Sequence, residues 1–249
     1  MRWLCFLLAS SVSAQGAHTL PAKPLRFDLT AVTPTRDSFI YRVRGEERGY
    51  AVWQYEIRSG ATGQEVVFTA ATELRPAEAE QLRVVLNRQS GDPISSFQRV
   101  DLFSPASDTV MLEHDLEVNR GAVQGRRRVG TRNGEIKIVP VGRPLPPGSV
   151  WSAYALYAAP AATLTPGDSL ATRAYSEFGD SLETLTFVAE QPDSVTVPAG
   201  RFAALPIRSA ALRVWVTRAA PRRVVKAEFF GGVLTLELVA TGPAVPSKP

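Results

Sequence analysis

The sequence Val-Pro-Ala-Gly-Arg-Phe at residues 197–202 marks a tight turn between two apolar runs. Pro198 restricts its own backbone, and Gly200 tolerates the left-handed conformation that tight turns often need. Two further apolar runs follow, Leu-Arg-Val-Trp-Val-Thr at 212–217 and Arg-Arg-Val-Val-Lys-Ala-Glu-Phe at 222–229. We interpret the whole stretch as three strands joined by tight turns.

Apolar and polar residues alternate through much of the chain in short runs that recur about every ten residues. A period of two places one face of a strand on a core and the other in water, which is typical of antiparallel sheets. The alternating apolar positions include Phe39, Tyr41 and Val43; Ala51, Trp53, Tyr55 and Ile57; Leu82, Val84 and Leu86; Leu112, Leu116 and Val118; and Leu234, Leu236 and Leu238. The pattern predicts an all-β sandwich or barrel.

Two short segments show helical signals instead. Ser149 can cap a helix over 149–159, in which Trp151 and Tyr154 follow helical spacing, and Pro160 would end it. This segment is apolar nearly all round, so we expect a short helix buried against the sheet. One helical turn is also expected at 76–81, with Pro76 at its first position.

The N-terminus has the features of a secretory signal. Arg2 supplies the positive charge, residues 4–12 are apolar, and small residues follow up to Ala14. We therefore predict a signal peptide at 1–14, an extended lead at 15–37, a single β-rich domain at 38–240 and a flexible tail at 241–249. The apolar run is shorter than the ~20 residues that cross a bilayer, so no transmembrane anchor is expected after cleavage.

The single cysteine, Cys5, lies within this predicted signal, so the mature chain would be exported without disulfides. This favours a protein of the bacterial periplasm or cell exterior that is held by its core. The formal net charge is +4, which suits a solvated surface or contact with anionic lipid or glycan. The densest basic cluster, 126–128, has no interleaved aromatic residues, so nucleic acid is not an expected partner.

The tetrapeptide Gly-Asp-Ser-Leu occurs twice, at 167–170 and 179–182. The second copy resembles the nucleophile block of the lipases and esterases named after it. A serine alcohol needs a neighbouring base, usually histidine, yet His18 and His114 both precede the two serines, and the Asp-x-x-His that this family carries near its C-terminus is absent. Gly-Asp-Ser is also ordinary turn chemistry, and we interpret both copies as turns, so no catalytic residue is assigned.

His114 lies on the apolar face of its predicted strand, between Leu112 and Leu116. It is either a hydrogen-bonded core histidine or a polar group on the wall of a ligand cavity. No second His or Cys accompanies it at metal-ligand spacing, so neither a metal nor a cofactor is expected. The aromatic residues are likewise either core or cavity lining. The candidate ligand-binding residues are His114, Trp53, Tyr55, Trp151, Tyr154 and Trp215.

The block from 149 to 229 resembles an uncharacterised family of exported bacterial domains of unknown function. The resemblance is carried by Val150–Tyr157, Pro166-Gly167, Leu170–Phe178, Val197–Phe202, Leu212–Val216 and Pro221–Val225. The family in turn resembles the half-barrel of periplasmic lipoprotein carriers. This implies a single strongly curved antiparallel sheet partly closed by a short buried helix, with a hydrophobic concavity and no known reaction.

Three functional hypotheses follow. The first is an exported, non-enzymatic envelope protein that binds an amphipathic or lipid-like ligand in the concavity of the sheet. The second is a structural or assembly partner of another envelope protein, with a filled core. The third, which the tetrapeptides support least, is a serine esterase.

Overall fold

The computed structural model describes residues 23–24, 28–61 and 63–245, and these form one sheet of 17 strands. The sheet is antiparallel except where β1 and β10 each pair in parallel with β11. Along the sheet the strands follow the order β1-β10-β11-β12-β13-β14-β15-β16-β17-β2-β3-β4-β5-β6-β7-β8-β9. The predicted all-β fold with one strongly curved sheet is therefore confirmed.

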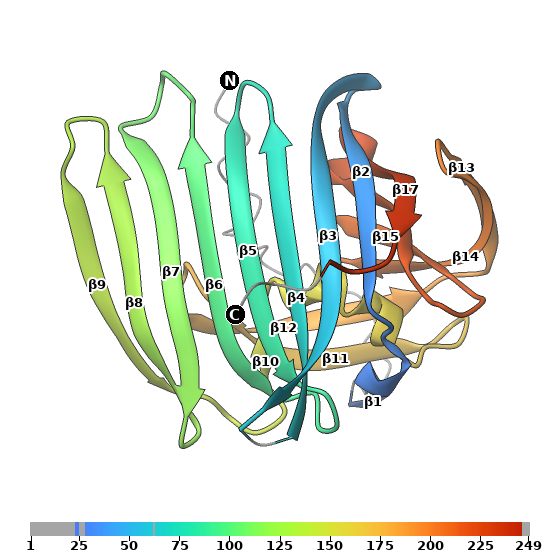
Figure 1. Ribbon diagram of the computed structural model, residues 1–249, viewed down its shortest axis with the longest axis horizontal. Helices are drawn as coiled ribbons and strands as arrows, with labels where there is room; N and C mark the ends of the chain where they lie inside the picture. Colours follow the sequence, from blue (N-terminus) through green and yellow to red (C-terminus); the bar gives the residue numbers. More distant parts are fainter. Residues whose placement is uncertain (1–22, 25–27, 62, 246–249) are drawn as a thin grey trace.

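The first half of the chain forms a layer of eight neighbouring strands, which stand side by side in Figure 1. These are β2 (Thr35–Val43), β3 (Glu46–Gly60), β4 (Gly63–Leu74), β5 (Glu78–Asn87), β6 (Pro93–Leu102), β7 (Thr109–Asn119), β8 (Ala122–Thr131) and β9 (Ile136–Pro144). Each pairs with the next along the chain, as expected for short connections between antiparallel strands.

The second half curves behind this layer, so that β10, β11 and β12 run across the back of it in Figure 1. Its strands are β10 (Val150–Trp151), β11 (Ser169–Ser176), β12 (Ser181–Ala189), β13 (Asp193–Val197), β14 (Gly200–Ser209), β15 (Leu212–Thr217), β16 (Val224–Phe229) and β17 (Leu234–Gly242). The short β1 (Lys23–Pro24) joins at β11, and β17 pairs with β2 to make both halves one sheet. The core lies between the two halves.

The helices are short: α1 (Tyr154–Tyr157) and the 3-10 turns η1 (Leu29–Ala31), η2 (Ala159–Ala161) and η3 (Phe230–Gly232). The predicted helix at 149–159 is therefore wrong in its first half. Val150 and Trp151 pair with Ala174 and Tyr175 of β11, and β-branched and aromatic side chains fit a pleated surface well. Only the end of the predicted segment is helical and buried against the sheet.

The helical turn predicted at 76–81 is also wrong, because β5 begins at Glu78 and pairs with β4 from that residue on. The turn at 197–202 is confirmed: β13 ends at Val197, β14 begins at Gly200, and Gly200 has a φ of +132°. The predicted signal at 1–14, residues 15–22 and 25–27 of the predicted lead and residues 246–249 of the tail lie outside the described residues. Within the described part, no helix is long and apolar enough to cross a membrane.

Candidate functional site

The concave face of β3 and β4 is packed with aromatic side chains. The Phe68 ring stacks on Tyr157 with centroids 4.1 Å apart, and the Tyr55 hydroxyl donates a hydrogen bond to the Tyr157 carbonyl oxygen at 2.6 Å. Trp53, which is 3% exposed, lies between Phe39 and Phe68. These contacts join the strand layer to α1, and side chains fill the space between them.

His114 is fully buried, with an exposed fraction of 0%. Its Nε2 lies 2.9 Å from the Ser96 hydroxyl oxygen, and its ring meets Phe178 edge-on at 4.9 Å. Burial, with the nearby Arg127 cation as the second cause, lowers the pKa of His114 to about 3. The imidazole is therefore neutral at physiological pH. Within the described part of the chain, its Nδ1 has no hydrogen-bond partner.

The remaining ligand candidates lie at separate places in the fold. Trp151 is buried and packs edge-on against Tyr175. Trp215 is 4% exposed and is covered by the Arg213 guanidinium and the Lys226 ammonium, at 4.5 and 5.0 Å from the ring centroid. The side chain of Tyr154 lies outside what the structure describes. Both tryptophans pack against other residues of the chain. A contact between these residues and a ligand stays a prediction.

A pair of glutamates also faces the interior. Glu78 and Glu80 lie two residues apart on β5, so they share its inner face, and the Gln98 amide donates a hydrogen bond to Glu80. Burial, and secondarily the charge of Glu80, raises the pKa of Glu78 to about 8. Burial also raises the pKa of Glu80. Glu78 is therefore largely protonated at neutral pH.

Both Gly-Asp-Ser-Leu segments lie at turns, as predicted. Gly167 has a φ of +89° just before β11, and Asp180 has a φ of +49° just before β12. The Asp180 carboxylate accepts a hydrogen bond from the Tyr175 hydroxyl at 2.9 Å and pairs with Arg143 at 3.1 Å. His18 lies outside the described residues, and His114 is bonded to Ser96 rather than to either tetrapeptide serine.

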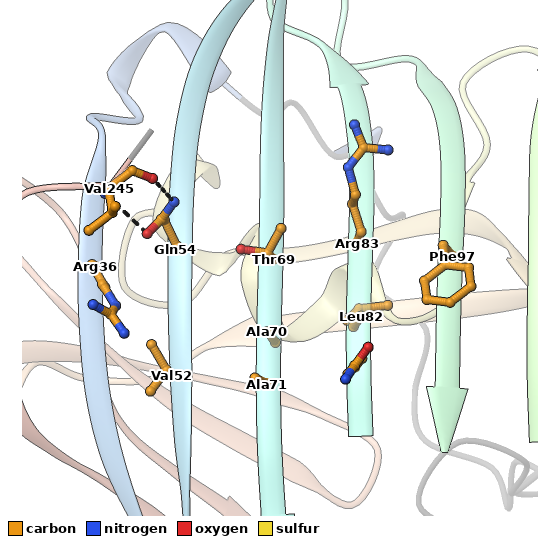
Figure 2. Close-up of a pocket in the computed structure, with 11 residues that line it drawn as sticks. Arg36, Val52, Gln54, Thr69, Ala70, Ala71, Leu82, Arg83, Phe97 and Val245 are labelled. Carbon is orange, nitrogen blue, oxygen red and sulfur yellow. Dashed lines mark hydrogen bonds between the residues drawn. The ribbon is translucent and has the colours of Figure 1, made fainter. Parts of the chain in front are cut away.

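A groove with a volume of about 560 Å³ lies on the outer face of β2–β6, opposite the concave face that carries the aromatic side chains. We call it the β4 groove (Figure 2). Its lining comprises Arg36, Val52, Gln54, Thr69, Ala70, Ala71, Gln81, Leu82, Arg83, Phe97 and Val245. None of these was a sequence-based candidate.

Strand register explains why a hollow forms here. Arg36, Gln54, Thr69, Arg83 and Phe97 are successive cross-strand partners, so they lie in one row across β2 to β6. On β4 the outward residues are Thr69 and Ala71, which are short, whereas Gln54 and Arg83 on the flanking strands are long. Small side chains on β4 therefore form the floor, and long ones form the walls.

The groove is basic and amide-rich. Among the residues that the structure describes, neither Arg36 nor Arg83 has an ion-pair or hydrogen-bond partner for its side chain, although many other arginines do. Phe97, on β6 next to Arg83 of β5, is only half-buried. The site thus combines two free guanidinium groups, an aromatic ring and the side-chain amides of Gln54 and Gln81.

The C-terminal segment reaches one end of the β4 groove. The Gln54 amide nitrogen donates to the Val245 carbonyl oxygen at 2.6 Å, and the Gln54 carbonyl oxygen accepts from the Val245 N–H at 3.2 Å. Figure 2 shows both hydrogen bonds. One side chain therefore binds both main-chain groups of one residue, which is a way to hold any peptide whatever its sequence.

Sequence patterning missed this groove because β4 itself was missed. Val66, Val67 and Phe68 are consecutive and all buried, so the run lacks clean alternation. The signal that could have revealed β4 was the alternation of the small or polar residues Thr69 and Ala71 with buried ones, between the strands predicted at 51–57 and 82–86.

The described residues contain no group of three His, Cys, Asp or Glu side chains placed to hold a metal ion.

No protein-family model matches the chain, and no curated protein sequence matches it. Among solved structures, a crystal structure of a beta-barrel-like protein of domain of unknown function DUF1849 from Brucella abortus is similar. The TM-score is 0.44 at 10% sequence identity, over 85% of this chain and 98% of that chain. None of these comparisons supports the resemblance to periplasmic lipoprotein carriers.

Proposed function

We propose that this chain is an exported, non-enzymatic protein of the cell envelope that binds a protein partner through the β4 groove on its outer face. The observation that carries the proposal is the location of this groove. The β4 groove opens outward, whereas Trp53, Tyr55 and Trp151 are buried in the interior. This favours a chain with a filled core that binds another protein over a chain that carries a ligand in the concavity of its sheet.

The composition of the β4 groove supports the same choice. Arginine and aromatic residues are enriched where proteins bind one another, and Arg36, Arg83 and Phe97 line the groove. Guanidinium groups without partners within the described chain remain available for a partner's acidic groups. The aromatic contacts between β3, β4 and α1 give this face a rigid support.

Capture from an envelope extract tests the proposal. Tagged wild-type protein is expected to retain a stoichiometric partner, and Ala71→Trp is expected to lose it because the indole fills the exposed floor of the groove. Thr196→Trp, on an exposed position of β13, is the matched control and should retain the partner. Equal capture by both variants would contradict the role of the groove, and co-purifying lipid in native mass spectrometry would favour a carrier.

Export is the second part of the proposal and rests on the charged, apolar and small residues at 1–14. The intact mass of protein recovered from a periplasmic or secreted fraction is expected to match a chain that begins at Gln15. Recovery of the uncleaved chain from the cytoplasm alone would contradict it.

A further inference from the structure

We infer that the β4 groove binds an extended, acidic peptide segment of the partner, and that the chain's own C-terminal segment at Ala244–Val245 competes for one end of it. This inference rests on the proposed function and specifies the chemistry of the partner. It is carried by three independent features of the groove: its width, its hydrogen-bonding groups and its charge.

The width favours an extended chain. The walls stand on β3 and β5, which flank β4, and neighbouring strands lie about 4.8 Å apart, so the walls are separated by about 10 Å. An α-helix with its side chains is about 10–12 Å across and would not reach the floor between these walls. A single extended peptide can lie along Thr69 and Ala71, whose short side chains let its backbone approach.

The hydrogen bonds indicate a peptide rather than a lipid or a glycan. Gln54 donates to the carbonyl oxygen and accepts from the N–H of the same residue, Val245. Every non-proline residue of a peptide offers the same two main-chain groups, an N–H donor and a carbonyl acceptor. The segment at Val245 is therefore an intramolecular occupant whose main chain shows what the groove recognises.

The charge indicates an acidic segment. Arg36 and Arg83 stand on opposite sides of the floor, and no carboxylate among the described residues pairs with either of them. Glu56, two residues from Gln54 along β3, already accepts a hydrogen bond from the Gln54 amide. Carboxylates of a segment bound between Arg36 and Arg83 would come within reach of a guanidinium group on either side of the floor.

The test is fluorescence anisotropy with a fluorescein-labelled hexapeptide of alternating valine and glutamate. A hexapeptide of alternating valine and lysine is the charge-reversed probe. The full-length chain is expected to bind the acidic probe and not the basic one, and the affinity should fall as ionic strength rises. Equal binding of the two probes would overturn the inference.

Two double variants test whether the acidic probe binds at the β4 groove. Arg36→Gln with Arg83→Gln is expected to weaken binding of the acidic probe by about three- to tenfold, because each exposed charge pair contributes modestly. Arg120→Gln with Arg218→Gln removes the same charge at exposed positions elsewhere and should leave the affinity unchanged. An equal loss in both double variants would show general attraction and would overturn the inference.

Truncation after Gly242 tests the competition. Removal of Val245 frees Gln54, so the truncated chain is expected to bind the acidic probe about threefold more tightly or better. Weaker or unchanged binding would overturn the competition. Stronger binding to phosphatidylglycerol vesicles than to the acidic probe would overturn the choice of a peptide.

The two proposals fail separately. If Ala71→Trp abolishes partner capture but the acidic probe does not bind, the proposed function stands and the acidic-peptide inference is wrong. If Ala71→Trp leaves capture intact, the groove is not the partner site and the proposed function is wrong.

Discussion

The Tyr55 hydroxyl donates a hydrogen bond to the main-chain carbonyl oxygen of Tyr157, 102 residues further along the chain, at 2.6 Å. Both residues are buried. This bond fixes the end of α1 to the concave face of β3, and the stacking of Tyr157 on Phe68 lies beside it. Tyr55, a candidate ligand-binding residue by sequence, thus bonds α1 on the concave face of the sheet.

Tyr55→Phe is expected to lower the free energy of unfolding by about 1–2 kcal/mol, because a buried carbonyl loses its donor. The melting temperature should fall by roughly 2–8 °C in a chain of this size. Tyr50→Phe is the matched control, since its hydroxyl bonds Glu73 on the exposed surface, and it should change stability little. An equal effect of the two changes would contradict a structural role for the Tyr55–Tyr157 bond.

Gly49→Ala is expected to cost at least about 2 kcal/mol of unfolding free energy, measured by urea denaturation. An added Cβ would lie 1.9 Å from the Glu73 carbonyl oxygen and 2.9 Å from the Leu74 Cα, so the pairing of β3 with β4 must open. Gly142→Ala meets nothing within 4 Å and serves as the control. A Gly49→Ala protein as stable as Gly142→Ala would show that β3 and β4 pair differently.

The contribution of Glu78 to the stability of the protein is expected to fall as pH rises from about 4.5 to about 8, the interval between the ordinary and the folded pKa of its carboxyl group. The folded chain holds the proton of Glu78 after the unfolded chain has released it, so each increase in pH favours unfolding. Burial also raises the pKa of Glu177 to about 7, which contributes in the same direction. Glu78→Gln should raise the melting temperature at pH 8.5 relative to wild type and have little effect at pH 4.

Glu47→Gln, at an exposed position of β3, is the control for that experiment. His114 acts in the opposite direction: its folded pKa of about 3 lies below the ordinary value of 6.5, so its contribution to stability is lost as pH falls from about 6.5 to about 3. A melting temperature that rises steadily from pH 5 to pH 8.5 in wild type would refute the assignment of Glu78.

Ser169→Ala and Ser181→Ala are expected to leave the fold, and any ester hydrolysis seen in the preparation, unchanged. Both serines follow turns at the starts of β11 and β12, and the Ser181 side chain is exposed. Hydrolysis of p-nitrophenyl acetate and butyrate is the measurement. Loss of hydrolysis in either variant, with an unchanged circular dichroism spectrum, would restore the esterase hypothesis.

Part of this fold could be predicted because its signals are local. The alternation of Leu112, His114 and Leu116 with charged neighbours identifies a strand with one buried face, and Pro198 with Gly200 identifies a turn. The helix at 149–159 was predicted too long because helical spacing says nothing about a distant strand that can pair with Val150 and Trp151.

The sequence by itself determined the all-β class, the exposed and buried faces of most strands and the turns, since these depend on the two-residue period of a strand and on the backbone preferences of proline and glycine. Only the tertiary structure decided where open space lies. The β4 groove requires Thr69 to stand between Gln54 and Arg83 in register, and the filled interior requires Tyr157 to meet Tyr55 and Phe68. Cross-strand register and layer packing join residues far apart in the chain, and local periodicity carries no information about either.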